Sequence, residues 1–90
     1  MIGIYKITNL INNNIYIGQS NNLELRWKRH QWAAFSNTPS NKEWDKPLYQ
    51  AMRKHGINNF SFEILEECPI EILDEREIYY ISKYNGLAYH

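Results

Sequence analysis

Two short β-rich runs joined by an asparagine-rich turn constrain the fold more than any other part of the chain. Residues 2–8 and 15–19 are rich in isoleucine and tyrosine, and four of the six residues between them are asparagine. β-Branched and aromatic side chains favour strands, and asparagine tolerates turn conformations. The two runs are therefore expected to form an antiparallel hairpin.

The register of this hairpin decides how its two tyrosines lie. If Tyr5 and Tyr16 are paired directly, the turn closes between residues 10 and 11, and both phenol rings lie on one face of the sheet. A bulge or a slip of one residue would place them on opposite faces, and the sequence does not distinguish these arrangements. Gly18, inside the second run, indicates that another group approaches the backbone closely at that position.

Downstream, the chain has the signals of two helices, a third strand and a last helix. Asn21 followed by Glu24 resembles a capping box. Pro47 suits the first turn of a helix, and Gly56 suits the position after its end. The expected helices and strand span residues 21–35, 47–56, 60–65 and 69–84. The order ββααβα predicts an α+β fold, in which a small three-stranded sheet built on the N-terminal hairpin is flanked by three helices.

The length of the chain, 90 residues, suits a single domain with a modest core. Three Trp, seven Tyr and three Phe must supply much of that core. Trp44 lies in a polar loop over residues 36–46. It is expected to fold back on the core rather than to contact a substrate, because Trp is highly buried on average.

The charges are sorted along the sequence although the net charge is zero. Residues 1–56 hold eight basic and three acidic side chains, a net charge of +5, and residues 57–90 hold two basic and seven acidic ones, a net charge of −5. The basic half could meet phosphate groups locally. Alternatively, folding mixes the two halves over one neutral surface, and both interpretations remain open.

The single cysteine, Cys68, excludes a disulfide within the chain, so a reducing compartment is expected. No apolar run approaches the length that spans a membrane, and no signal peptide is visible. These features predict a cytoplasmic, intracellular protein with no membrane partner. The motifs of zinc hydrolases, serine hydrolases and P-loop nucleotide-binding proteins are absent from the sequence.

Glu77 is the strongest chemical signal that the residues give by themselves. It falls within an apolar stripe of the last expected helix, between Leu73 and Tyr80, and is expected to be shut off from water. A buried carboxylate is costly unless a cation or hydrogen-bond donors compensate it. A metal ion, an arginine or a position at the edge of the core could each do so, and the spacing does not choose between them.

Arg26 and His30 lie one turn apart on the first expected helix. A guanidinium suits bidentate phosphate binding, and an imidazole can shuttle a proton. Taken singly, each is expected to be a surface residue.

Together these residues resemble the GIY-YIG nuclease family. Residues 3–5 read Gly-Ile-Tyr and residues 16–18 read Tyr-Ile-Gly, at the family's usual separation. The further matching segments are residues 25–30, 48–56, 59–62, 75–77 and 80–81, so that the resemblance covers nearly the whole chain. It is closest to the catalytic domains of phage intron-type homing endonucleases.

The resemblance implies a divalent-metal-dependent endonuclease that hydrolyses DNA phosphodiester bonds. Tyr5 and Tyr16 would lie at the scissile phosphate, where one of them would deprotonate or orient the attacking water with a phenol pKa lowered by nearby cations. Arg26 would bind the phosphate and stabilise the transition state, and His30 would assist by proton relay or phosphate contact. Glu77 would hold a single Mg²⁺ or Mn²⁺, with substrate oxygens completing the site.

One departure and two alternatives accompany the resemblance. Family members commonly carry a Gly-Tyr-Asn segment after the third helix, whereas this chain stops at His90, and Asn85 is not expected to be the corresponding residue. The interpretation is one domain over residues 1–90, truncated at its C-terminus, with the DNA-recognition region outside this chain. The alternatives are an inactive DNA-binding or interaction module, and a structural domain whose tyrosines are buried far from Arg26.

Overall fold

The structure is a computed structural model whose described residues are 1–84. Asn85 and His90, on which the comparison of the C-terminal segment depends, lie outside that range. None of the helices within residues 1–84 is long and apolar enough to span a membrane.

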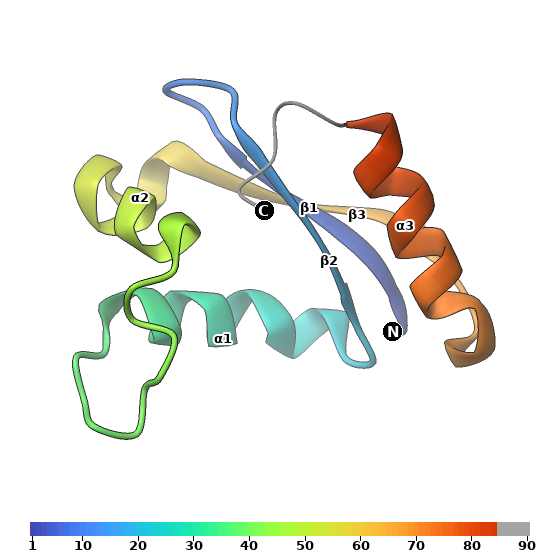
Figure 1. Ribbon diagram of the computed structural model, residues 1–90, viewed down its shortest axis with the longest axis horizontal. Helices are drawn as coiled ribbons and strands as arrows, with labels where there is room; N and C mark the ends of the chain where they lie inside the picture. The colour runs from blue at the N-terminus through green and yellow to red at the C-terminus, as the bar shows by residue number, and fades with distance from the viewer. Residues whose placement is uncertain (85–90) are drawn as a thin grey trace.

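A three-stranded antiparallel sheet forms the centre of the fold (Figure 1). Its strands are β1 (Gly3–Asn9), β2 (Ile15–Ser20) and β3 (Phe60–Glu67), in the spatial order β2-β1-β3. The helices are α1 (Leu23–Phe35), α2 (Pro47–His55) and α3 (Leu73–Lys83), with short 3₁₀ turns at Ile57–Asn59 and Ile70–Ile72. The α+β class and the order ββααβα expected from the sequence are confirmed.

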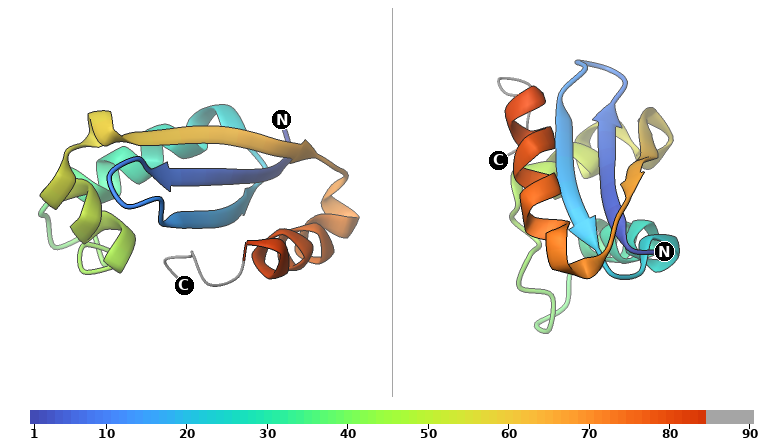
Figure 2. Two further views of the ribbon diagram at one scale, coloured as in Figure 1. Left: turned by 90° about the horizontal axis from the view of Figure 1, so that it is seen from above. Right: turned by 90° about the vertical axis from the view of Figure 1, so that its right-hand side faces the viewer.

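Helices cover both faces of the sheet (Figure 2). Tyr5 and Ile7 point to the face that is covered by α1 and α2. Ile4 and Ile17 point to the opposite face, against α3. Successive side chains of a strand alternate between faces, so β1 is the shared wall of two small cores.

The hairpin register differs from direct pairing of its tyrosines. Tyr5 is paired with Gly18, and Ile7 is paired with Tyr16, so the register is shifted by two residues. The reason lies in the turn, where the Asn9 amide donates to the Asn14 carbonyl and Asn13 adopts a left-handed conformation with φ 64°. Because side chains alternate with a period of two, the shift keeps both tyrosines on one face.

Two further boundaries differ from the expectation, and one agrees with it. The cap of α1 is Asn22 rather than Asn21, because the Asn22 side chain accepts the Leu25 amide at 3.2 Å. A 3₁₀ turn follows Pro69, so α3 begins only at Leu73. As expected, α2 begins at Pro47.

Trp44 is half-buried, and its partner is a cation. The Arg53 guanidinium lies 3.7 Å from the centre of the Trp44 ring and donates to the carbonyls of Ala34, at 2.8 Å, and of Trp44, at 2.7 Å. Arg53 of α2 thereby ties the loop 36–46 to the end of α1.

Candidate active site

The pairing of Tyr5 with Gly18 begins the site. A Cβ atom on Gly18 would overlap the hydroxyl oxygen and ring of Tyr5, so the phenol ring lies across the bare backbone of β2. The close approach that the sequence indicates at Gly18 is therefore made by Tyr5. Gly3 has a comparable role on the other edge of β1, where a Cβ would overlap the Glu66 carbonyl beside an irregularity in the β1–β3 pairing.

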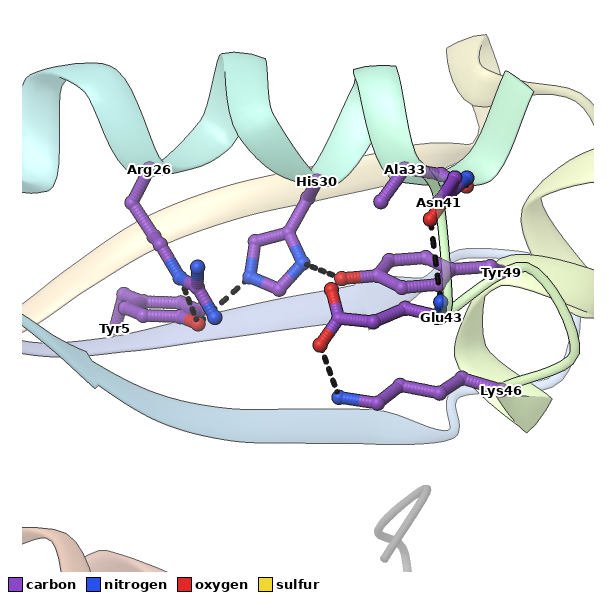
Figure 3. A network of polar contacts seen from close by, with 8 residues as sticks. All are labelled: Tyr5, Arg26, His30, Ala33, Asn41, Glu43, Lys46 and Tyr49. Atoms are coloured by element: carbon purple, nitrogen blue, oxygen red, sulfur yellow. Dashed lines mark hydrogen bonds and ion pairs between the residues drawn. The ribbon is translucent and has the colours of Figure 1, made fainter. Parts of the chain in front are cut away.

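The Tyr5 hydroxyl lies between two side chains of α1 (Figure 3). The Arg26 Nε group donates to it at 3.1 Å, and His30 Nε2 lies 2.6 Å from it. Tyr5 is fully buried, and Arg26 is half-buried. This contact contradicts the alternative in which the tyrosine hydroxyls lie far from Arg26.

His30 is buried rather than exposed, which corrects the expectation of a surface role. It is 1% exposed, and its second ring nitrogen, Nδ1, lies 2.8 Å from the hydroxyl of Tyr49 in α2. Burial, reinforced by the positive charge of Arg26, lowers the pKa of His30 to about 3. The imidazole is therefore neutral near pH 7, with one nitrogen that donates and one that accepts.

The hydrogen-bond partners limit where the protons can lie in this chain of groups. Arg26 can only donate, so its bond uses a lone pair of the Tyr5 oxygen. Within residues 1–84, His30 Nε2 is the remaining partner of that hydroxyl, and it is the acceptor that the Tyr5 proton requires. If Tyr5 donates there, the imidazole proton lies on Nδ1 and is donated to the Tyr49 oxygen.

The pKa of the Tyr5 phenol moves in the direction opposite to that expected from the resemblance. Burial raises this pKa well above its usual value, although the hydrogen bond from Arg26 opposes the shift. Tyr5 is therefore a neutral donor near pH 7. Burial, followed by the negative charge of Glu43, likewise raises the pKa of Tyr49 to about 12.

Tyr16 joins the cluster from β2 as a half-buried residue. The centre of its ring lies 6.3 Å from that of Tyr5 and 5.6 Å from that of His30. Phe62 of β3 stacks on Tyr5 with a centroid distance of 5.0 Å. Four of the five residues expected at the site are thus brought together on the α1 side of the sheet.

Glu77 is placed differently. It lies on α3, which packs against the opposite face of the sheet through Leu73, Tyr80 and Ile81. Glu77 is half-buried, so it is not shut off from water as the sequence predicted. The sheet covers little of α3, and Leu73 is its sole buried residue in the described range.

Glu77 has no compensating cation among residues 1–84. The pair that does form on this side of the molecule joins Arg76 to Glu66, with Arg76 Nε and Nη2 donating at 2.9 and 2.8 Å. In the described part of the chain, no three His, Cys, Asp or Glu side chains gather as a preformed metal site would require.

A groove of about 670 Å³ lies beside the tyrosine cluster, between the end of β2, the first turns of α1 and the start of α3. Arg26 lines this groove while holding the Tyr5 hydroxyl, so it connects the groove to the buried cluster. Arg29, one residue before His30, also lines it and is exposed. The groove therefore carries two guanidinium groups, opposed by Asp74, which accepts a hydrogen bond from Gln19 at 2.6 Å.

A family described as the GIY-YIG catalytic domain matches residues 1–89 of the chain. The chain belongs to this family. The membership expected from the motifs is confirmed.

Curated relatives of this GIY-YIG domain include two proteins named as endonucleases. Intron-associated endonuclease 1 of Enterobacteria phage T4 is 39% identical over 86 residues, which are 93% of this chain and 33% of the relative. The probable intron-encoded endonuclease 1 of Neurospora crassa is 32% identical over 90 residues, 92% of this chain and 27% of the relative. The GIY-YIG domain thus spans a third or less of the length of these relatives.

Solved structures show the same fold. The catalytic domain of the homing endonuclease I-TevI is 34% identical and has a TM-score of 0.77, over 98% of this chain and 97% of that domain. A mutant of that catalytic domain is 35% identical, with a TM-score of 0.78 over 99% of this chain and 91% of the mutant chain. Family and fold together assign the GIY-YIG domain to the nucleases.

Sequence reasoning missed Tyr49 as a member of the site. A signal was present, because Tyr49 lies three residues before Met52 on the buried face of α2. A buried tyrosine hydroxyl requires a polar partner. In the GIY-YIG domain that partner is His30. The sequence does not reveal that His30 is buried, because charged residues surround it in α1.

Proposed function

We propose that this chain is an endonuclease that hydrolyses DNA phosphodiester bonds with the help of a divalent metal ion. The observation that carries the proposal is the contact between Arg26 and Tyr5 at the wall of the groove. It joins a phosphate-binding group to a hydroxyl that is linked to an imidazole. The family and the homing endonuclease structures support the same chemistry.

Arg26 is proposed to bind the scissile phosphate. Its Nε group holds Tyr5, which leaves the two Nη groups of a guanidinium to donate to phosphate oxygens. A fixed positive charge at this place would stabilise the negative charge that develops during in-line attack. One strand of the substrate would follow the groove that Arg26 and Arg29 line.

Proton transfer is proposed to use the tyrosines and His30. Tyr16 is half-buried and would orient the attacking water, whereas the Tyr5 hydroxyl meets water only after Arg26 shifts toward the phosphate. Tyr5 would take a proton from the water while its own proton passes to His30 Nε2. The hydroxide attacks phosphorus, and the leaving oxygen takes its proton from solvent.

Glu77 is proposed to hold Mg²⁺ or Mn²⁺. The side chain fits this role in its chemistry, because it is a half-buried carboxylate that pairs with no cation among residues 1–84. Water and substrate oxygens would have to supply the other ligands, since the described residues offer no acidic cluster. When bound, such an ion neutralises phosphate charge and lowers the pKa of a coordinated water.

A plasmid-nicking assay with Mg²⁺ or Mn²⁺ tests this function. We expect Arg26→Ala and Glu77→Ala each to reduce nicking by about 100-fold or more, since each removes transition-state charge stabilisation. Glu75→Ala, which removes an exposed acid from the same helix, is the control and should cut as the wild type does. Unchanged nicking in both test variants would contradict the assignment.

An inactive DNA-binding module is the second candidate, favoured by the position of Glu77 on the opposite side of the sheet from the tyrosine cluster. It predicts DNA binding that Glu77→Ala leaves unchanged and no nicking by the wild type with either ion. We further propose that sequence recognition lies outside this chain, because the chain spans a third or less of its curated relatives.

A further inference from the structure

We propose that Tyr49 is a positioning residue, which accepts the Nδ1 proton of His30 and so keeps Nε2 free to receive the proton of Tyr5. The proposal rests on the nuclease function proposed above. It adds a residue from α2 to a set of polar groups whose other members lie on β1, β2 and α1.

Three buried side chains from three elements form the chain of contacts. Tyr5 of β1, His30 of α1 and Tyr49 of α2 are 0%, 1% and 2% exposed. The Tyr5 oxygen lies 2.6 Å from His30 Nε2, and the Tyr49 oxygen lies 2.8 Å from His30 Nδ1. Figure 3 shows the imidazole held between the two hydroxyls, with Arg26 at the far end.

The direction of donation follows from Arg26. Arg26 already donates to one lone pair of the Tyr5 oxygen, so a proton on His30 Nε2 would be a second donor to the same oxygen. The Tyr5 hydroxyl proton would then have no acceptor among residues 1–84. The opposite tautomer gives the Tyr5 proton an acceptor at Nε2 and the Nδ1 proton an acceptor at the Tyr49 oxygen, and it leaves the Tyr49 proton beside the negative charge of Glu43, which favours that orientation.

The same acceptor is needed after the proton moves. When His30 takes the proton of Tyr5, both ring nitrogens carry hydrogen, and Nδ1 continues to donate to the Tyr49 oxygen without rearrangement. A neutral hydroxyl stabilises the resulting cation less than a carboxylate would. The imidazole therefore holds the proton only briefly and returns it readily.

The charged and titratable groups that face His30 come from several elements. Arg26 of α1 and Lys46 disfavour a positive imidazole, Glu43 favours it, and the two tyrosines at the ring nitrogens are neutral donors or acceptors near pH 7. Glu43 and Lys46 are paired with each other at 2.8 Å in the loop before α2. A change at Tyr49 leaves all these charges in place.

Tyr49→Phe tests the inference, because it removes the oxygen and keeps the ring. Nitrogen-15 NMR of the His30 side chain should show the proton on Nδ1 in the wild type, and a shift of the population toward Nε2 in the variant. We expect nicking to slow by about 10- to 100-fold, the range found when a metal-binding histidine loses the partner that orients its ring. DNA affinity should change little, and the circular dichroism melting temperature should fall by about 5–10 °C, because a buried His30 nitrogen loses its partner.

Tyr79→Phe, which removes an exposed hydroxyl on α3, is the matched control and should change neither the tautomer nor the rate. A proton that stays on Nδ1 in Tyr49→Phe, or a wild type with the proton on Nε2, would overturn the inference. The NMR comparison needs no DNA. A wild type that cuts no DNA would therefore count against the nuclease function, while the tautomer result would still decide the role of Tyr49.

Discussion

The phenol ring of Tyr5 occupies the space above Gly18 where any other residue would carry its side chain. This relationship explains in physical terms why the Tyr-Ile-Gly half of the family motif, residues 16–18, ends in glycine. The glycine lets a large ring cross the strand and reach α1, where its hydroxyl meets Arg26 and His30. The two halves of the motif are thus one packing unit across a strand pair.

The first prediction concerns this unit. Gly18→Ala should destabilise the fold by about 1–3 kcal/mol, because the new methyl group displaces the Tyr5 ring from a fully packed position. Urea denaturation of the variant measures the loss. In a background of Tyr5→Ala the ring is absent, so the same substitution should cost less than about 1 kcal/mol. Equal costs in both backgrounds would show that the ring is not what Gly18 accommodates.

The second prediction is a dependence of stability on pH. His30 has a pKa of about 3 in the fold and an ordinary value near 6.5 in the unfolded chain, so between these values the unfolded chain alone binds the proton. The free energy of unfolding should therefore fall as the pH falls through this window, by up to about 1.4 kcal/mol per pH unit. Arg26, Glu43 and Lys46 are the charged groups that act on this imidazole.

Urea midpoints at about pH 7.5 and about pH 5 test this dependence, above the range in which paired carboxylates gain protons. His30→Gln should flatten the slope, whereas His55→Gln, which removes an imidazole outside the cluster, should preserve it. A slope that survives in His30→Gln would contradict the prediction.

The third prediction concerns the groove. Arg29 lines it, whereas Lys28, an exposed neighbour on the same helix, does not. If a DNA strand follows the groove, Arg29→Gln should weaken binding and lower the slope of log affinity against log salt by about 1. The corresponding Lys28→Gln variant should change the slope less. Equal effects would indicate binding by the overall charge of α1 rather than by the groove.

The fourth prediction concerns the loop over residues 36–46. Arg53→Ala removes two hydrogen bonds to carbonyls and the contact with the Trp44 ring, and should destabilise the domain by about 1–3 kcal/mol. Hydrogen exchange should accelerate first in the amides of the loop. Lys54→Ala, on the exposed side of the same turn, should leave that exchange unchanged.

The order of elements was predictable because local signals agree with the fold. Three local signals each indicate one kind of structure, and the fold contains that structure in each case. They are the alternation along the strands, Pro47 at the start of α2 and Gly56 after its end. The sequence left open whether Tyr5 and Tyr16 share a face, and the structure places them on one face. The observed register differs by two residues from direct pairing of the tyrosines, and a shift of two preserves the face.

The remaining features depend on contacts between elements that are far apart in the sequence. The burial of His30 becomes evident only when Tyr5 and Tyr49 are known to flank it, since the spacing along α1 fits a surface residue equally well. The prediction that Glu77 is shut off from water was wrong for a different reason. An apolar stripe predicts the face of a helix but not how much of that face the sheet covers, and α3 stays largely open.

The central strand of the sheet precedes both of its neighbours along the chain. One of its edges pairs with β2 at once, but the other stays open until β3 has left the ribosome. A chain that ends before β3 would carry Tyr5, Tyr16, Arg26, His30 and Tyr49, and yet leave an apolar strand with an unpaired edge. Folding should therefore occur as one late event, with slow, non-local pairing as its final step. Fusions are better joined after α3 than within the chain, because a fragment that ends before β3 leaves the sheet open and one that ends before α3 leaves the face of Ile4 and Ile17 uncovered.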